Sequence, residues 1–277
     1  MSSITIGLMN SLVVFEEFPH GVYLGDAEEK VLLPKKYVTS KMKIGTTVDV
    51  FIYMDSEDRP VATTIMPRAQ AGQFAMMVIK AITPVGAFAD WGLEKDLLIP
   101  FREQIRPLEE GEEVVVYVYV DDTDRMAGST KIRHYLMEHT DELVKGQEVE
   151  ALFYDSNEKG IECIIDGQFR GLLFWNQVFE ELVPGDTRRA WIGQVREDGK
   201  IDLVLKPPHF ILARDLDADK ILHVLKADGG YLPLSDTSSP EEIKRVLGMS
   251  KKAFKKAVGG LYKSNLIKLD RGGIRLV

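Results

Sequence analysis

A stretch of fifteen residues occurs twice in this chain, and this repeat constrains the fold more than any other feature of the sequence. Residues 50–64 read VFIYMDSEDRPVATT and residues 116–130 read VYVYVDDTDRMAGST. The identical pairs are Val50/Val116, Tyr53/Tyr119, Asp55/Asp121, Asp58/Asp124, Arg59/Arg125 and Thr64/Thr130. Such self-similarity at a fixed spacing predicts that the chain builds one small structural unit more than once.

The residues around the repeat follow a common order in three units. In the first two, a glycine-aromatic segment (GVYLG at 21–25, GAFADW at 86–91) precedes an apolar run that ends in proline (VLLP at 31–34, DLLIP at 96–100). A glycine, an alternating strand and the Asp-rich turn follow. A third, more diverged unit contains GLLFWNQV at 171–178 and REDGKIDLVL at 196–205. Short strands between Gly, Asp and Pro turns predict small β-barrels.

The strand before each Asp-rich turn alternates between two kinds of side chain. In the first unit Val48, Val50 and Ile52 face one way, whereas Phe51 and Tyr53 face the other. Period-two alternation predicts a strand with one side in the barrel core and an aromatic opposite side. The aspartates lack the spaced acids, glycine and terminal Glu of a calcium loop, so we interpret them as solvated hairpin turns.

The formal charge of −8 hides a division between two parts of the chain. Residues 241–277 contain ten Lys or Arg against three acids, a net charge of +7, which leaves −15 on residues 1–240. An acidic body with a basic end module indicates a polyanionic partner.

The basic module has helical periodicity. Apolar residues of DKILHVLKADGG predict one helix, and Ser239 as N-cap with Gly248 as its stop predicts a second. Ser250 caps a third helix, in which the lysines lie opposite an apolar stripe. LIKLDRGGIRLV predicts a terminal hairpin. Three helices and a hairpin make a winged helix whose lysine-bearing helix takes the recognition position.

The repeated unit resembles the S1 RNA-binding domain, a five-stranded barrel of the OB type, in its G-x-F segment, its GLL or DLLIP run and its G-x-x-V-x-V-x-V strand. The order of three such units before a winged helix resembles the bacterial conserved virulence factor B and YitL-like family. The resemblance covers nearly the whole chain, including MSKKAFKKAVGGLYK. It implies RNA binding linked to the regulation of gene expression, without a known catalytic activity.

The predicted fold class is mainly β with a C-terminal α+β module: three tandem OB-type, S1-like β-barrels followed by a winged-helix domain. The predicted boundaries are residues 1–69 and 70–132 for the first two barrels, 133–145 for a helical linker, 146–210 for the third barrel and 214–277 for the winged helix. Two linker histidines, His134 and His139, are five apart and are interpreted as surface residues rather than metal ligands.

The resemblance also implies where RNA would bind, because S1-type barrels stack bases on aromatic residues of their second and third strands. The candidate stacking residues are Tyr23, Phe88, Trp91, Phe174 and Trp175. The candidate cations of the third barrel are Arg170, Arg188, Arg189, Arg196 and Lys200. The candidate phosphate contacts of the basic module are Lys251, Lys252, Lys255, Lys256, Lys263 and Arg271. Interdomain packing, or a plug in the barrel, is the alternative role for each aromatic residue.

Two departures from the S1 pattern restrict this expectation. Glu162 stands where the third unit should offer its aromatic residue, and three acids follow Tyr23 in YLGDAEEK. The first barrel is therefore the least suited of the three to bind RNA.

Three classes of function remain open. The leading one is a non-catalytic binder of single-stranded RNA. The alternatives are a winged-helix DNA-binding transcription regulator and an acidic adaptor that docks on the ribosome or RNA polymerase. The chain has no nucleophile elbow, phosphate loop or paired-cysteine motif, so we expect no enzyme activity, cofactor, metal or small-molecule substrate. The single Cys163, and the absence of a signal-like segment or a long apolar run, predict a cytoplasmic protein without a membrane partner.

Overall fold

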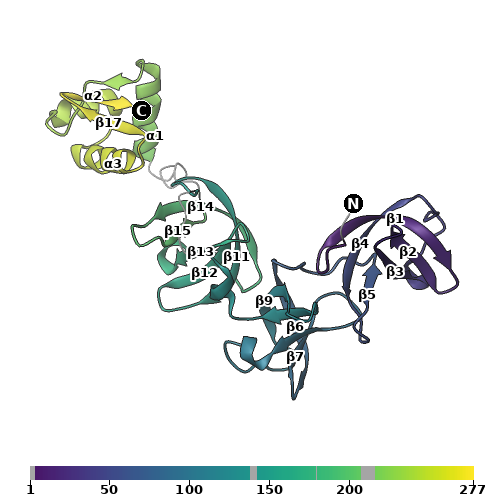
Figure 1. The fold of residues 1–277 in the computed structure, drawn as a ribbon. Coiled ribbons are helices and arrows are strands. Elements are labelled where there is room, and N and C mark those ends of the chain that lie inside the picture. Colours follow the sequence, from purple (N-terminus) through teal and green to yellow (C-terminus); the bar gives the residue numbers. More distant parts are fainter. Residues whose placement is uncertain (1–3, 138–141, 179, 207–215) are drawn as a thin grey trace. The chain divides into compact units, whose positions relative to one another are not determined.

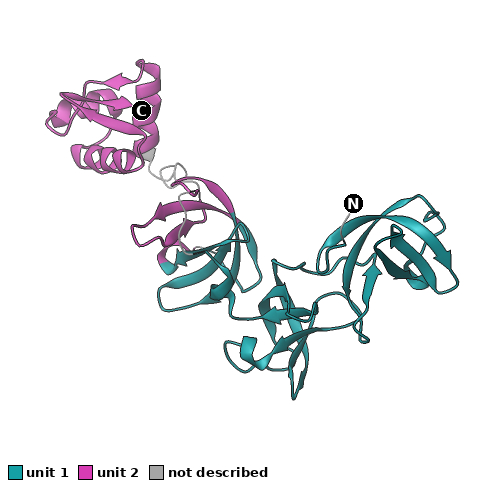
Figure 2. Ribbon diagram, in the orientation of Figure 1, with its two compact units in different colours: residues 1–140, 150–175, 179–188 teal, residues 141–149, 176–178, 189–277 magenta. Residues whose placement is uncertain are grey.

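The computed structural model describes residues 4–137, 142–178, 180–206 and 216–277. Its order of elements is three five-stranded barrels followed by a helical module (Figure 1). Two compact units divide the chain: residues 1–140, 150–175 and 179–188 form the first, and residues 141–149, 176–178 and 189–277 form the second (Figure 2). The division runs through the third barrel.

The first two barrels have the same topology. Barrel 1 contains β1 (Met9–Phe18), β2 (Gly21–Gly25), β3 (Lys30–Pro34), β4 (Thr47–Met54) and β5 (Pro60–Thr63), closed in the order β1-β2-β3-β5-β4. Barrel 2 contains β6 (Phe74–Thr83), β7 (Gly86–Asp90), β8 (Leu97–Pro100), β9 (Glu113–Val120) and β10 (Met126–Ser129). In both, the third strand pairs parallel with the fifth, Leu32 with Val61 and Leu98 with Ala127. The repeat in the sequence is therefore a repeat of one OB-like barrel.

Barrel 3 contains β11 (Glu148–Ser156), β12 (Gly160–Ile165), β13 (Phe169–Phe174), β14 (Thr187–Val195) and β15 (Ile201–Val204). It closes in the corresponding order, β11-β12-β13-β15-β14. The fold class predicted from the sequence, three OB-like barrels and a winged helix, is confirmed.

The repeated aspartates shape the hairpins that connect the fourth and fifth strands. Asp55 Oδ1 accepts the backbone N–H of Arg59 at 3.1 Å, and Asp121 Oδ1 accepts that of Arg125 at the same distance. Asp58 and Asp124 both adopt a positive φ in the left-handed region. Asp tolerates this region better than most residues do. Turn geometry thus accounts for the repeated Asp residues.

The interior side of each alternating strand fills a barrel core. Val50 and Ile52 of β4, and Val116 and Val118 of β9, are fully buried. Phe51, on the opposite side of β4, is also fully buried, because it belongs to the apolar cluster of barrel 2. Barrels 1 and 2 therefore share a packed contact within their compact unit.

The segment after barrel 2 differs from the predicted helical linker. Within its described residues, 130–137 and 142–147, the helical part is a short 3-10 turn, Ile132–Tyr135. The Tyr135 ring stacks on Tyr117 with centroids 3.9 Å apart, and the Met137 amide donates to Gln168 O at 2.9 Å. The segment is thus held by contacts with the two flanking barrels instead of by the backbone hydrogen bonds of an α-helix. His134 is exposed, and His139 lies outside the described residues.

The last module is built from three helices and a three-stranded sheet. The helices are α1 (Leu216–Ala227), α2 (Pro240–Leu247) and α3 (Lys251–Lys263). The strands β16 (Tyr231–Leu232), β17 (Ile267–Asp270) and β18 (Gly273–Leu276) pair in the order β16-β18-β17. Ser239 forms the capping box that starts α2, and Gly248 ends this helix in the left-handed conformation.

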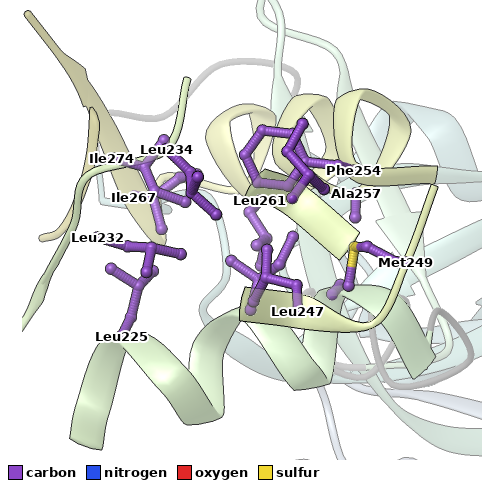
Figure 3. Packing of buried hydrophobic residues seen from close by; sticks show 13 residues of the cluster. Leu225, Leu232, Leu234, Leu247, Met249, Phe254, Ala257, Leu261, Ile267 and Ile274 are labelled. Atoms are coloured by element: carbon purple, nitrogen blue, oxygen red, sulfur yellow. The ribbon is translucent and has the colours of Figure 1, made fainter. Parts of the chain in front are cut away.

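The core of this module lies between the helices and the sheet (Figure 3). Phe254, Ala257 and Leu261 of α3 pack there with Leu247 and Ile274. The i, i+3, i+7 spacing of the α3 residues keeps them on one face, which leaves its lysines on the other.

Candidate nucleic-acid interface

The strand register identifies equivalent positions in the three barrels. The second strand of each barrel starts with a glycine that pairs with the last residue of the third strand. Two residues later, Tyr23 pairs with Leu32, Phe88 with Leu98 and Glu162 with Leu172. The register thus gives Tyr23, Phe88 and Glu162 one structural position, on the strand face that OB-type barrels use to bind oligonucleotides.

Phe88 lies at a cavity of about 370 Å³ on this face of barrel 2. Its half-buried ring shares the wall with Trp91 and Leu98. Tyr53 of barrel 1 also lines the cavity, as do the cationic side chains of Lys95 and Arg125. The cavity therefore combines aromatic surface with charged groups of both signs, because Asp96 and Asp121 also line it. The sequence pattern does not identify Tyr53, Lys95 or Arg125 as binding residues, because the cavity forms only where two barrels meet.

Trp91 is a wall of this cavity rather than an accessible stacking platform. It is 2% exposed, its indole N–H donates to Lys95 O at 2.6 Å, and its ring meets Phe51 edge to face at 5.7 Å. A base can stack on an indole only where a face of the ring is open, and this ring is packed. We therefore correct the assignment of Trp91 as a stacking residue: it holds barrels 1 and 2 together.

The corresponding face of barrel 1 carries a small aromatic cluster. The Tyr23 ring meets Phe18 edge to face at 5.4 Å, and His20 stacks on Phe18 at 5.6 Å. Lys30 Nζ lies 5.1 Å from the Tyr23 ring centroid and forms an ion pair with Glu16 at 2.8 Å. The sequence FPHGVY could have predicted this cluster, because it places two aromatic residues and a histidine around one hairpin turn.

In barrel 3 the same position holds a buried carboxylate. Glu162 is 1% exposed and accepts hydrogen bonds from Arg133, from the Tyr154 hydroxyl and, at 2.9 Å, from Asn157 Nδ2. Burial alone would raise the pKa of Glu162, but the bonds from Arg133 and Tyr154 outweigh it and lower this pKa to about 2. Burial and the neighbouring Glu162 charge raise the pKa of the Tyr154 phenol. Glu162 is thus a fixed anion that does not offer an aromatic surface.

The other candidates of this region are Arg170 and Phe174 in β13 and Trp175 in the 3-10 turn that follows it. Arg170 pairs with Glu162 at 3.3 Å, so its charge is partly used within the protein. Phe174 pairs with Gly160 in the register, the place that Pro34 and Pro100 hold in the other barrels. Trp175 is 47% exposed, and its indole N–H donates to Asn157 O at 2.9 Å. Trp175 therefore offers more open aromatic surface than Trp91.

The four remaining candidate cations of barrel 3 each have an acidic partner. The four ion pairs are Arg188–Asp186 at 3.2 Å, Arg189–Glu148 at 3.0 Å, Arg196–Asp202 at 2.8 Å and Lys200–Asp198 at 2.6 Å. Exposed pairs of this kind contribute little stability, so a phosphate can compete for the cation. Their positive potential is nevertheless reduced by the adjacent carboxylates.

Helix α3 presents a cluster of positive charge. It contains no acidic residue, and its exposed lysines are Lys252, Lys255, Lys256 and Lys263, with Lys251 half-buried at the N-terminus. The Ser250 hydroxyl caps the helix by accepting the Ala253 amide at 3.2 Å. Arg271 is exposed at the tip of the β17–β18 hairpin, the wing of the module.

Comparison with known proteins agrees with this architecture. Residues 6–65 and 71–131 each match the S1 domain, and residues 219–276 match the CvfB-like winged helix domain. YitL of Bacillus subtilis, an uncharacterized protein, is 29% identical over 275 residues, which covers 96% of this chain and 92% of that protein. Conserved virulence factor B of Staphylococcus saprophyticus is 27% identical over 264 residues, which covers 91% of this chain and 87% of that protein. Over most of its length the chain is similar to the conserved virulence factor B and YitL proteins.

A solved structure similar to this chain is a multidomain protein with nucleic acid binding domains from Streptococcus pneumoniae. It is 26% identical, and the match covers 98% of each chain with a TM-score of 0.44. The S1 domains that this chain contains support a nucleic-acid-binding role.

Two further observations concern only the ranges that the structure describes. Across these residues, no three His, Cys, Asp or Glu side chains are grouped so that they could hold a metal ion. No helix in them is both long and apolar enough to cross a membrane.

Proposed function

We propose that this protein is a non-catalytic RNA-binding regulator of gene expression that engages single-stranded RNA. Bases would stack on Phe88 of barrel 2, and exposed lysines of α3 would contact phosphates. Its encounter with RNA would take place in the cytoplasm, the location expected from the sequence.

The Phe88 cavity is the observation that carries this proposal. Its aromatic ring lies on the strand face of an S1 domain, next to apolar surface and to the side chains of Lys95 and Arg125. Single strands present unstacked base faces to such a platform, whereas a duplex hides them. Single-stranded nucleic acid is therefore the partner that the geometry favours.

A second candidate function is supported by the winged-helix module. Lysines on the exposed face of a recognition helix, and Arg271 in the wing, are also suited to the backbone of duplex DNA. A transcription regulator would use this module as its main contact, and the barrels would then contribute little to the affinity.

Competition in solution distinguishes these functions. A labelled single-stranded RNA is bound by the full-length protein, and unlabelled RNA or duplex DNA with the same number of phosphates is added. We expect the RNA to displace the label at a concentration at least tenfold lower. Equal or better displacement by the duplex would favour the transcription regulator. Capture of ribosomes or RNA polymerase that survives nuclease treatment, without binding of free RNA, would favour an adaptor.

A further inference from the structure

Two barrels contribute to the cavity that borders Phe88. Tyr53 and Met54 come from the end of β4 in barrel 1, whereas Phe88, Leu98 and Met126 come from barrel 2. Both barrels belong to one compact unit. A single S1-type barrel therefore supplies only part of this site.

Specific contacts hold the two barrels in the arrangement that forms the cavity. Arg125, in the β9–β10 turn, donates from Nε to Asp58 Oδ1 of barrel 1 at 2.6 Å. Lys95 Nζ lies 3.4 Å from the Met54 carbonyl oxygen. Phe51 packs into the barrel 2 cluster beside Trp91. Apolar packing and charged contacts thus both position the barrel 1 part of the lining, Tyr53 and Met54.

Tyr53 is fixed in this wall by its neighbours. Its ring stacks beside Phe51 at 6.2 Å and meets the edge of Trp91 at 6.5 Å. Burial raises the pKa of its phenol, so the hydroxyl remains protonated and can both donate and accept a hydrogen bond at neutral pH. Asp121 and Thr123 add polar groups to the lining.

We propose that barrels 1 and 2 together form a pocket for one unstacked nucleobase of a single strand, with Tyr53 as the contribution of barrel 1. The inference rests on the proposed function and extends it from a stacking surface on one barrel to a cavity lined by two barrels. A planar base suits this site because the lining supplies aromatic rings, flexible Met54 and Met126 side chains and a few polar atoms. Lys95 and Arg125 balance the charges of Asp96 and Asp121 in this lining, so the adjoining phosphates meet no net negative charge from it.

The repeat provides a matched control for Tyr53. Tyr119 holds the same position in barrel 2, sixty-six residues later, but it does not line the cavity and its ring faces Tyr135 at 6.1 Å. Tyr53→Ala removes the proposed base contact, Tyr53→Phe keeps the ring, and Tyr119→Ala removes a ring elsewhere.

The test compares an oligouridylate of about 12 nucleotides, a length within the range that OB folds cover, with an abasic oligomer of the same length. We expect Tyr53→Ala to weaken binding of the oligouridylate roughly tenfold and to leave binding of the abasic oligomer unchanged. Tyr53→Phe and Tyr119→Ala should bind both oligomers like the parent.

Other results would contradict the two-barrel pocket. They can be distinguished from the result that would contradict the proposed function. If Phe88→Ala weakens oligouridylate binding but Tyr53→Ala does not, stacking takes place on barrel 2 alone. Equal weakening of both oligomers by Tyr53→Ala would show a loss of fold or of phosphate contact instead of a base contact. Absence of oligouridylate binding by the parent would reject the proposed function itself together with the pocket.

Discussion

The Arg133 guanidinium donates to the carboxylate of Glu162, which is 1% exposed and stands at the position that Phe88 holds in the preceding barrel. This pair joins the segment after barrel 2 to β12 of barrel 3. The position that holds the candidate stacking residue Phe88 in barrel 2 is thus used for an internal ion pair in barrel 3.

We predict that Arg133→Ala destabilises barrel 3. Removing one partner of a fully buried pair costs about 3–5 kcal/mol. The Arg133 side chain is 47% exposed, and Arg170 remains beside Glu162 in the variant. Solvent screening therefore reduces the expected loss to roughly 2 kcal/mol.

The control for this prediction is Arg189→Ala, which breaks an exposed pair with Glu148 in the same barrel. This change should cost less than about 1 kcal/mol. Calorimetric unfolding of both variants measures the difference. Equal losses would contradict a stabilising role for the buried pair.

The same cluster predicts a dependence of stability on pH. The pKa of Glu162 is lowered from its ordinary value of 4.5 to about 2, so its stabilising contribution is complete above pH 4.5 and is lost as the pH falls toward 2. Glu162→Gln removes this titration. The difference in melting temperature between parent and variant should therefore shrink from pH 5 to pH 2. A constant difference over this interval would show that Glu162 does not titrate with the fold.

Local patterns allow most of the fold to be predicted. Ser239, Gly248 and Ser250 mark helix ends because caps depend on neighbouring residues alone, and the structure places them as the sequence indicates. The turns at Asp55 and Asp121 can be predicted for the same reason, because each Asp bonds to a backbone amide only four residues later. Alternation along β4 predicts which valines fill the core.

Contacts between repeats cannot be predicted in the same way. Phe51 and Trp91 have the pattern of exposed aromatic residues, and only the meeting of two barrels buries them. The sequence pattern places Arg133 in a helical linker. Its partner, Glu162, is 29 residues away, and no local pattern links the two residues. The sequence shows that Glu162 replaces the expected aromatic residue, but it does not show that Arg133 pairs with this carboxylate.

Limited proteolysis tests the predicted domain boundaries. We expect the first cut in the full-length chain near residues 207–218, of which 207–215 lie outside the described residues. Cleavage at residues 132–137 should be slower, because Ile132 and Leu136 are buried. Mass spectrometry of the early fragments identifies the sites. An early cut within residues 100–120 would contradict the predicted boundaries.

The lysines of α3 should supply phosphate contacts. On a single strand, each neutralised phosphate adds about −0.7 to the slope of log affinity against log salt concentration. Changing Lys252, Lys255 and Lys256 to Glu should therefore flatten the slope by about two, without unfolding the module, because none of the three belongs to its core. A variant that keeps the parental slope, or that loses only duplex DNA binding, would remove α3 from RNA recognition.

The exposed Trp175 allows barrel 3 to be tested separately. We expect Phe174→Ala or Trp175→Ala to weaken binding of single-stranded RNA less than Phe88→Ala does, because barrel 3 has Glu162, which cannot stack on a base, at the position of Phe88. Anisotropy titrations of the three variants measure the order. A larger loss from either barrel 3 variant would place the main stacking site there.

Phe88→Ala gives the most direct test of RNA binding on the strand face. Phe101→Ala is its control, because Phe101 is 52% exposed on the same barrel and does not line the cavity. Loss of one stacking platform costs about 1–3 kcal/mol, so the Phe88 variant should bind a single-stranded RNA roughly ten- to a hundredfold more weakly than the parent, while the Phe101 variant binds like the parent. Parental affinity in a folded Phe88→Ala protein would contradict the account.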